Sequence, residues 1–189
     1  MGSEGTSGSE ILYKKVSEPK FRTLLPGFKA DYMPVDCKDD QLYYVTNEDA
    51  SNYALMKIDL NRPSRIETVI PEDGKSLLDG VGTAGGYLFA SYLEDAQSRI
   101  RQYDYDGRLV RTVELPAIGT VGGFDGEKED AELYYTLTNY TSPATVYKYD
   151  IASGASTLYK APEVKFDPAQ FTTCLLYTSD AADDLIGVD

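Results

Sequence analysis

Prolines that follow short apolar runs recur at a fixed stride along this chain. Pro26, Pro71, Pro116 and Pro162 are separated by 45, 45 and 46 residues. Leucines that open alternating runs and aspartates that close them keep nearly the same step; they are Leu42, Leu88 and Leu133, and Asp59, Asp104 and Asp150. A period of this length, built from short alternating strands and without helical periodicity, is typical of the four-stranded blade of a β-propeller.

The strand pattern predicts an all-β chain that forms a partial β-propeller of about three and a half antiparallel blades. Residues 1–26 form a half blade with strands at 11–16 and 21–25. Three full blades occupy 27–71, 72–116 and 117–162. Their predicted strands are 31–35, 41–47, 53–59 and 65–70; 77–81, 87–93, 99–105 and 109–115; and 120–124, 132–138, 145–151 and 156–160.

Turn-forming residues separate these strands. Hairpin turns are expected at Lys38-Asp39-Asp40, Asn61-Arg62-Pro63, Asp106-Gly107 and Ser153-Gly154. Two first strands run into glycine-rich segments, 80–85 and 119–123, where small residues suit the crowded inner strands of a propeller. Three and a half blades leave unpaired strand edges, so we expect this chain to be part of a larger protein that lacks its true N-terminus here.

Composition limits the partners of the chain. With 18 Lys and Arg against 31 Asp and Glu, the net charge of −13 argues against a nucleic-acid surface. No segment is apolar enough for a membrane helix and no leader is visible, so we expect no membrane contact. We expect the protein to lie in the cytoplasm or periplasm of a bacterium. The two cysteines, Cys37 and Cys174, lie too far apart for a Cys-x-x-Cys site, and Cys37 reads as a small hydrophobe in or beside a strand.

Catalytic and cofactor motifs are weak in this sequence. It contains no histidine, which excludes a Ser-His-Asp triad made within these residues. The string Gly80-Val-Gly82-Thr-Ala-Gly85 matches a dinucleotide-binding pattern, but a strand follows it where that pattern needs a helix. Asp104-Tyr-Asp106-Gly107 reads as a hairpin turn and not as a calcium loop. Asn139-Tyr-Thr141 is a glycosylation sequon without a sign of secretion. We therefore predict no metal and no cofactor.

The repeat pattern stops after Phe171. Residues 163–173 are expected to start a linker to a further domain, and residues 174–189 resemble a translated sequencing adapter. The alternative is a genuine crossover strand at 175–178. Adapter residues are excluded from fold reasoning, so we assign no chemistry to Cys174, Asp180, Asp183 or Asp184.

Several phrases, taken together, resemble the propeller domain of the prolyl oligopeptidase family of serine peptidases. They are Ser-Glu-Gly-Thr-Ser-Gly at 3–8; Thr-Asn at 46–47 with Asn-Tyr-Ala-Leu-Met-Lys-Ile-Asp at 52–59; Gly-Thr-Val-Gly-Gly-Phe-Asp-Gly at 119–126 with Glu-Leu-Tyr-Tyr at 132–135; and Ser-Pro at 142–143 with Val-Tyr-Lys-Tyr-Asp at 146–150. The resemblance implies the C-terminal half of a propeller that caps an α/β-hydrolase domain, whose triad cleaves short peptides after proline. No catalytic residue of such a triad lies in this chain.

One position is transferred from the family. The residue after the Glu-Gly pair of the 3–8 segment can be a cysteine near the substrate cavity, and here it is Thr6, which is also readable as a turn-forming hydroxyl. The first functional hypothesis is therefore a propeller part that gates access of short proline-containing peptides to a catalytic domain elsewhere in the protein. The second is a non-enzymatic propeller module that binds a protein or peptide on its blade ends.

Overall fold

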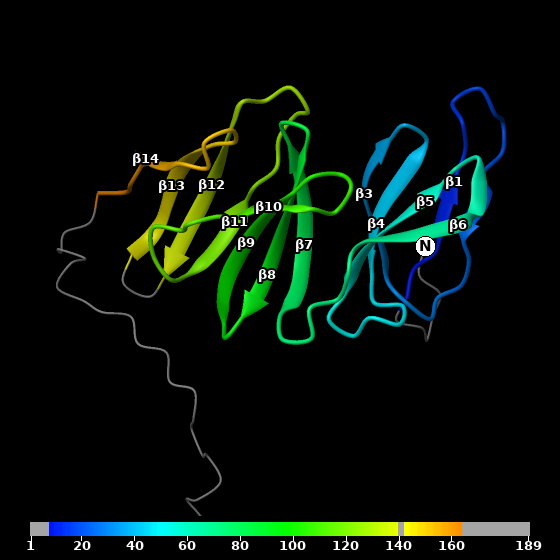
Figure 1. Cartoon of the computed structure of the whole chain (residues 1–189), viewed down its shortest axis with the longest axis horizontal. Helices are drawn as coiled ribbons and strands as arrows, with labels where there is room; N and C mark the ends of the chain where they lie inside the picture. The colour runs from blue at the N-terminus through cyan, green and yellow to red at the C-terminus, as the bar shows by residue number, and fades with distance from the viewer. Residues whose placement is uncertain (1–7, 140–141, 164–189) are drawn as a thin grey trace, which may run out of the picture.

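A computed structural model describes residues 8–139 and 142–163, and these residues form β-sheets joined by turns (Figure 1). Strands β1 (Ile11–Tyr13) and β2 (Arg22–Leu25) pair as a two-stranded sheet. No helix occurs within the described ranges, so none of them holds a helix able to cross a bilayer. The predicted all-β class is confirmed.

Three four-stranded antiparallel sheets follow, each a meander of strands consecutive in sequence. The first contains β3 (Tyr32–Lys38), β4 (Gln41–Thr46), β5 (Ala54–Asp59) and β6 (Arg62–Ile70). The second contains β7 (Leu77–Ala84), β8 (Tyr87–Glu94), β9 (Gln97–Tyr103) and β10 (Leu109–Thr112). The third contains β11 (Thr120–Gly123), β12 (Glu132–Asn139), β13 (Ser142–Asp150) and β14 (Ser156–Lys160). The sheets stand side by side in chain order, as blades of an open propeller arc (Figure 1).

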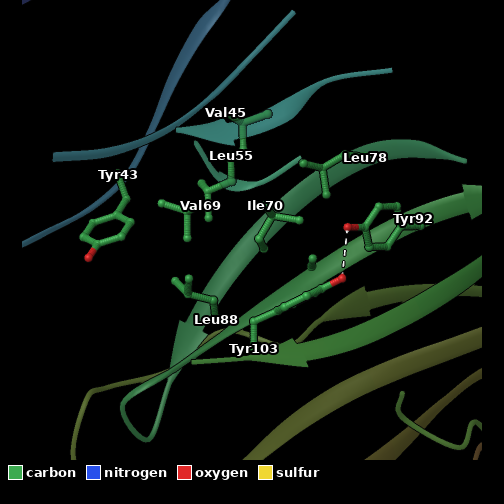
Figure 2. Close-up of a cluster of buried hydrophobic side chains, with 10 residues drawn as sticks. Tyr43, Val45, Leu55, Val69, Ile70, Leu78, Leu88, Tyr92 and Tyr103 are labelled. Atoms are coloured by element: carbon green, nitrogen blue, oxygen red, sulfur yellow. Dashed lines mark hydrogen bonds between the residues drawn. The ribbon is translucent and has the colours of Figure 1, made fainter. Parts of the chain in front are cut away.

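Two apolar interfaces hold the three full sheets together. The first interface, between β3–β6 and β7–β10, includes Val45, Leu55, Ile70, Leu78 and Leu88 together with the rings of Tyr43, Tyr92 and Tyr103 (Figure 2). The second interface, between β7–β10 and β11–β14, is rich in aromatic rings. Its buried rings are those of Phe89, Phe124, Tyr135 and Tyr149. A third cluster joins the half blade to the first full sheet.

Two predicted turns are shorter in the structure: Lys38 belongs to β3, and the larger difference is at Asn61-Arg62-Pro63. Arg62 and Pro63 belong to β6, and only Leu60 and Asn61 form the turn. The Asp59 carboxylate accepts hydrogen bonds from the backbone N–H of Asn61 (2.9 Å) and Arg62 (3.2 Å), which closes a tighter turn than expected. Pro63 is tolerated in the strand because β6 is the outer edge of its sheet.

The glycine-rich segment after residue 77 also differs from the prediction. Strand β7 continues through Gly80 and Gly82 to Ala84, and only Gly85 and Gly86 form the turn. A Cβ on Gly82 would lie 2.3 Å from the Phe124 carbonyl oxygen of the next blade. Gly82 therefore serves the predicted close approach of neighbouring blades from inside a strand and not from a turn.

Smaller differences concern strand ends and one side chain. Strands β1 and β10 end earlier than predicted, at Tyr13 and Thr112, while β3 runs past its predicted end to Lys38. Cys37 lies in β3, as expected, but its side chain is exposed, so it does not act as a buried small hydrophobe.

Candidate functional site

The first strand of each full sheet ends at the same end of the arc, and the turns there enclose a pocket. Its lining comes from the β3–β4 turn region, the β7–β8 turn, the β9–β10 hairpin and the loop after β11. We call it the three-turn pocket; it has a volume of about 290 Å³ and is lined by Asp36, Cys37, Lys38, Asp39, Thr83, Ala84, Gly86, Tyr105, Gly126, Glu127 and Lys128.

Left-handed backbone conformations set the shape of two of these turns. Asp39 and Asp40 have φ of 51° and 59°, and Gly85 and Gly86 have φ of 57° and 78°. Two consecutive residues with positive φ are the geometry of the tight two-residue hairpin, which matches the right-handed twist of the flanking strands. Each turn therefore brings the end of an inner strand directly to the pocket.

The loop after β11 is fixed to β7 of the preceding blade by backbone hydrogen bonds. The N–H of Gly126 donates to the Thr83 carbonyl (2.8 Å), and the N–H of Gly85 donates to the Glu127 carbonyl (3.0 Å). The N–H of Thr83 donates to an Asp125 carboxylate oxygen at 3.1 Å. The loop after β11, which lines the pocket, is thus held in place by the second full sheet.

Tyr105 and Asp36 link the first two full sheets at the pocket wall. The Tyr105 hydroxyl donates a hydrogen bond of 2.5 Å to the Asp36 Oδ2 atom, and the Tyr43 hydroxyl donates to the Tyr105 carbonyl at 3.4 Å. The Lys38 Nζ atom lies 4.1 Å from the centre of the Tyr105 ring, within the range of a cation–π contact. Burial, and then the bond to Asp36, raises the pKa of Tyr105, so this phenol stays protonated as the donor at neutral pH.

The Cys37 thiol is a potential nucleophile in the lining of this pocket, and its surroundings reduce its reactivity. Partial desolvation of the sulfur by the pocket wall raises the pKa of the Cys37 thiol, although the residue as a whole is exposed, and the carboxylates of Asp36 and Asp40 raise it further. A thiol with a raised pKa holds little thiolate at neutral pH, which makes it a poor nucleophile. The pocket presents the carboxylates of Asp36, Asp39 and Glu127, and it also presents the ammonium groups of Lys38 and Lys128. Its chemistry therefore suits binding of a zwitterionic or peptide-like molecule.

The dinucleotide-like and calcium-like motifs of the sequence lie in a strand and in a hairpin turn. The segment from Gly80 to Gly85 is followed by β8, so the pyrophosphate geometry of a dinucleotide fold is not formed. Asp104 closes the β9–β10 hairpin by accepting bonds from the N–H of Asp106 and Arg108. Within residues 8–139 and 142–163, no group of three Asp, Glu, His or Cys side chains is arranged to hold a metal ion.

Thr6, the one site residue transferred from the family resemblance, lies outside the described residues. The same holds for Cys174, Asp180, Asp183 and Asp184. Sequence reasoning did not single out Asp36 or Tyr105, which lie 69 residues apart. Only the repeat offered a signal, because it predicts that equivalent turns of successive blades meet at one end of the arc.

A fold of radially arranged four-stranded meanders, with a pocket among the turns of successive sheets, defines the class of β-propeller proteins. A family model described as "Prolyl oligopeptidase, N-terminal beta-propeller domain" matches residues 2–162. The chain belongs to this family.

Relatives with known names agree with this assignment. The chain is 39% identical over 181 residues to a prolyl endopeptidase of Elizabethkingia miricola, and the match covers 94% of this chain and 25% of that protein. It is 38% identical over 182 residues to a prolyl endopeptidase of Elizabethkingia meningoseptica, with the same two coverages. The chain thus spans about a quarter of the length of the curated relatives it matches.

Solved structures show the same arrangement of strands. A structure from a study titled "Structural and Mechanistic Analysis of Two Prolyl Endopeptidases" superposes with a TM-score of 0.82 at 32% identity, over 88% of this chain and 25% of that one. The apo form of prolyl oligopeptidase B from Galerina marginata gives a TM-score of 0.80 over 88% of this chain and 25% of that one. At 20% identity, the second match supports the fold alone.

Proposed function

We propose that this chain forms part of the propeller of a prolyl-oligopeptidase-like serine endopeptidase and controls access of short proline-containing peptides to a separate α/β-hydrolase domain. The observation that carries the proposal is the match over residues 2–162 to the family's propeller domain, combined with relatives named prolyl endopeptidases. The absence of histidine from all 189 residues supports a division of labour, because a Ser-His-Asp triad needs a residue that this chain does not supply.

The three-turn pocket supplies the candidate contact surface for such peptides. It lies where the inner strands of the full sheets turn back, and it offers ammonium groups and carboxylates within one cavity. A peptide carries charges of both signs, so a surface of mixed charge orients it without holding it tightly. The proposal includes a location of the whole protein in the cytoplasm or periplasm of a bacterium. It includes no nucleic-acid partner, because the net charge of the chain is −13.

A chimera tests the division of labour. Residues 2–162 replace the equivalent propeller segment of the Elizabethkingia miricola prolyl endopeptidase, and hydrolysis of a short reporter that releases a fluorophore after proline is measured. We expect the chimera to cleave the reporter, and the chain alone to show no turnover. Robust turnover by the chain alone would show that the chemistry lies in these residues and would overturn the proposal. A folded but inactive chimera would instead favour the binding module.

Charge reversal in the chimera tests the gating part. Lys38→Glu with Lys128→Glu should lower kcat/KM for a short proline-containing peptide that bears a free carboxylate by about 1.5- to 5-fold, since exposed charge contacts are worth about 0.2–1 kcal/mol. The same peptide without the carboxylate should be unaffected. Lys14→Glu, which changes the same charge in the half blade, is the control. Equal effects of all three changes would remove the pocket from the mechanism.

A further inference from the structure

The turn of the half blade differs from its counterparts in the full sheets. Eight residues, 14–21, join β1 to β2, whereas two residues join β5 to β6 and five join each of the pairs β9–β10 and β13–β14. We call residues 14–22 the half-blade hairpin. The N–H of Glu18 donates to the Lys15 carbonyl (2.9 Å), and the Glu18 carboxylate accepts from the N–H of Lys15 (3.3 Å) and pairs with Arg22. These contacts fix the shape of the hairpin in the free chain, which lowers the ordering cost of binding.

The half-blade hairpin is basic, although the chain as a whole is acidic. It carries Lys14, Lys15, Lys20 and Arg22 against one acidic residue, Glu18. The other residues carry 14 Lys and Arg against 30 Asp and Glu, because the whole chain has 18 and 31. Lys15 and Lys20 are exposed and form no ion pair with any other described residue. Their charges are therefore available to an acidic surface.

Exposed apolar side chains lie among these charges. Val16 is 101% exposed and Phe21 is 62% exposed. The Lys14 Nζ atom lies 5.2 Å from the centre of the Phe21 ring, so the ring and the cation form one surface. Exposed apolar groups rimmed by charged residues are typical of a surface that contacts another protein.

The half-blade hairpin lies at the same end of the arc as the three-turn pocket (Figure 1). The N–H of Ser9, before β1, donates to the Ala30 carbonyl (3.0 Å), and the N–H of Tyr32, the first residue of β3, donates to the Ser9 hydroxyl (2.8 Å). β1 and β3 therefore start side by side at one end of the arc and run to the other end, where their turns lie (Figure 1). We call the latter the turn end.

The turns of the full sheets make the rest of the turn end acidic. Residues 36–40, 104–108 and 125–130 together carry nine Asp and Glu against three Lys and Arg. Apolar side chains are exposed here as well, because Leu109 and Val110, which begin β10, are 54% and 42% exposed. The turn end thus presents a basic hairpin and acidic turns, each with exposed apolar groups beside the charges.

We propose that two copies of this chain associate turn end to turn end about a two-fold axis, with the half-blade hairpin of each copy on the acidic turns of the other. Opposite charges select this partner, and Leu109 and Val110 offer apolar surface to Val16 and Phe21. A two-fold contact uses the same two patches twice and closes at a dimer. It is possible here because both patches lie at one end, whereas patches at opposite ends would join copies head to tail without closing.

The dimer covers the three-turn pocket, since Asp36, Asp39 and Glu127 of its lining belong to the same turns. The inference does not rest on the gating proposal, because it follows from the charges of the turn end. Its readout is the mass of the particle and not the hydrolysis of a peptide, so the two proposals fail independently.

Sedimentation of the full 189-residue chain tests the association. We expect a reversible monomer–dimer equilibrium that weakens as the salt concentration rises from about 20 mM to 0.5 M, because salt screens exposed charges. A chain that stays monomeric at every protein concentration would overturn the proposal. Particles larger than a dimer would overturn the two-fold arrangement.

Charge reversal identifies the two patches. Lys15→Glu with Lys20→Glu should raise the dissociation constant of the dimer at least about tenfold, because both contacts become repulsive. Asp106→Lys with Glu129→Lys, two exposed positions in the acidic turns, should have the same effect. An equimolar mixture of the two double variants should dimerise again, because each hairpin then meets turns of the opposite charge.

Lys75→Glu with Lys160→Glu is the matched control. Both lysines are exposed, and they lie at the other end of the arc, just before β7 and at the end of β14. This variant has the same net charge as Lys15→Glu with Lys20→Glu and should dimerise as the unchanged chain does. Equal unfolding midpoints show that each variant is folded. A dimer that survives Lys15→Glu with Lys20→Glu, or a mixture of the two complementary variants that stays monomeric, contradicts the proposal.

Discussion

The two interfaces between the full sheets use the same repeat but different side chains. The first interface contains aliphatic residues such as Leu55, Ile70 and Leu88 beside the rings of three tyrosines (Figure 2). At its rim the two sheets are linked by the Tyr105–Asp36 hydrogen bond. In the second, buried rings contact one another among aliphatic residues: the Phe124 ring centre lies 4.6 Å from that of Tyr135 and 5.4 Å from that of Tyr149. The comparison shows that a 45-residue period fixes where blades meet, while each interface is packed by its own residues.

The two interfaces also differ in where their polar contacts lie. In the second interface, the buried Gln102 amide and the Tyr149 hydroxyl form a network inside the apolar cluster. In the first, the strong inter-sheet hydrogen bond lies at the three-turn pocket, in contact with solvent. We therefore expect the second interface to respond most to changes of volume and the first to respond to changes of charge.

The largest expected effect is the loss of the central ring of the second interface. Phe124→Ala should lower the free energy of unfolding by about 3–5 kcal/mol, because it removes a fully buried ring that contacts Phe89, Tyr135 and Tyr149. Urea unfolding of the full chain measures the change. Ile70→Val in the first interface should cost only about 0.5–1.5 kcal/mol. A cost below about 1.5 kcal/mol for Phe124→Ala would contradict the view that the second interface responds most to changes of volume.

An intermediate effect is expected from one added methyl group. Gly82→Ala should cost about 1–3 kcal/mol, because the new Cβ would lie 2.3 Å from the backbone oxygen of Phe124 and the third sheet would have to move. Gly80→Ala in the same strand is the matched control, since no atom lies within 4 Å of its Cβ position, and it should change stability by less than about 0.5 kcal/mol. Thermal unfolding distinguishes the two. If both substitutions were neutral, the close approach of the blades would not matter for stability.

The smallest expected effect concerns alkaline pH at the first interface. The pKa of Tyr105 is raised in the folded chain, so its contribution to stability is complete below the ordinary tyrosine pKa of about 10. As the pH rises beyond that value, the unfolded chain releases the proton more readily, and the contribution is lost. Unfolding free energy measured between about pH 9 and 11 should therefore fall, and Tyr105→Phe should flatten the decline.

Other tyrosines add to the alkaline response and provide its control. Burial, with a smaller contribution from Glu48, raises the pKa of Tyr44 to about 12 in the cluster beside the half blade. Tyr44→Phe should flatten the decline as well, but it should leave the Tyr105–Asp36 contact between the full sheets unchanged. A decline with the same slope in wild type and Tyr105→Phe would show that this hydroxyl does not link the sheets.

Much of the fold was predictable because it rests on local patterns. Alternating apolar residues, the leucine and aspartate steps, and turn signals such as Asp106-Gly107 identified all the strands, with errors at their ends. One error is local: the Asp59 carboxylate closes its turn on the N–H of Asn61, two residues away, and Arg62 and Pro63 belong to β6. The other is not local: β7 continues through Gly82, where the next blade lies too close for a Cβ, and the strand pattern does not contain that approach.

The candidate sites were far less predictable. Thr6 came from family resemblance and stays a prediction, since it lies outside the described residues. Tyr105 was read only as part of the Asp104-Tyr-Asp106-Gly107 hairpin, and Asp36 was not singled out. Their hydrogen bond joins residues 69 positions apart, and such a contact is a property of the packed chain.

The sequence alone determined that this protein is a series of antiparallel sheets with a period near 45 residues, that it carries a strong negative charge, and that histidine chemistry lies outside it. Hydrophobic alternation is a local property and composition is a sum over residues, so both can be obtained directly from the sequence. Tertiary structure decided which side chains meet between blades and which turns enclose a pocket. Those outcomes depend on the packing of residues many tens of positions apart, where shape and hydrogen-bond geometry select among contacts that the sequence permits equally.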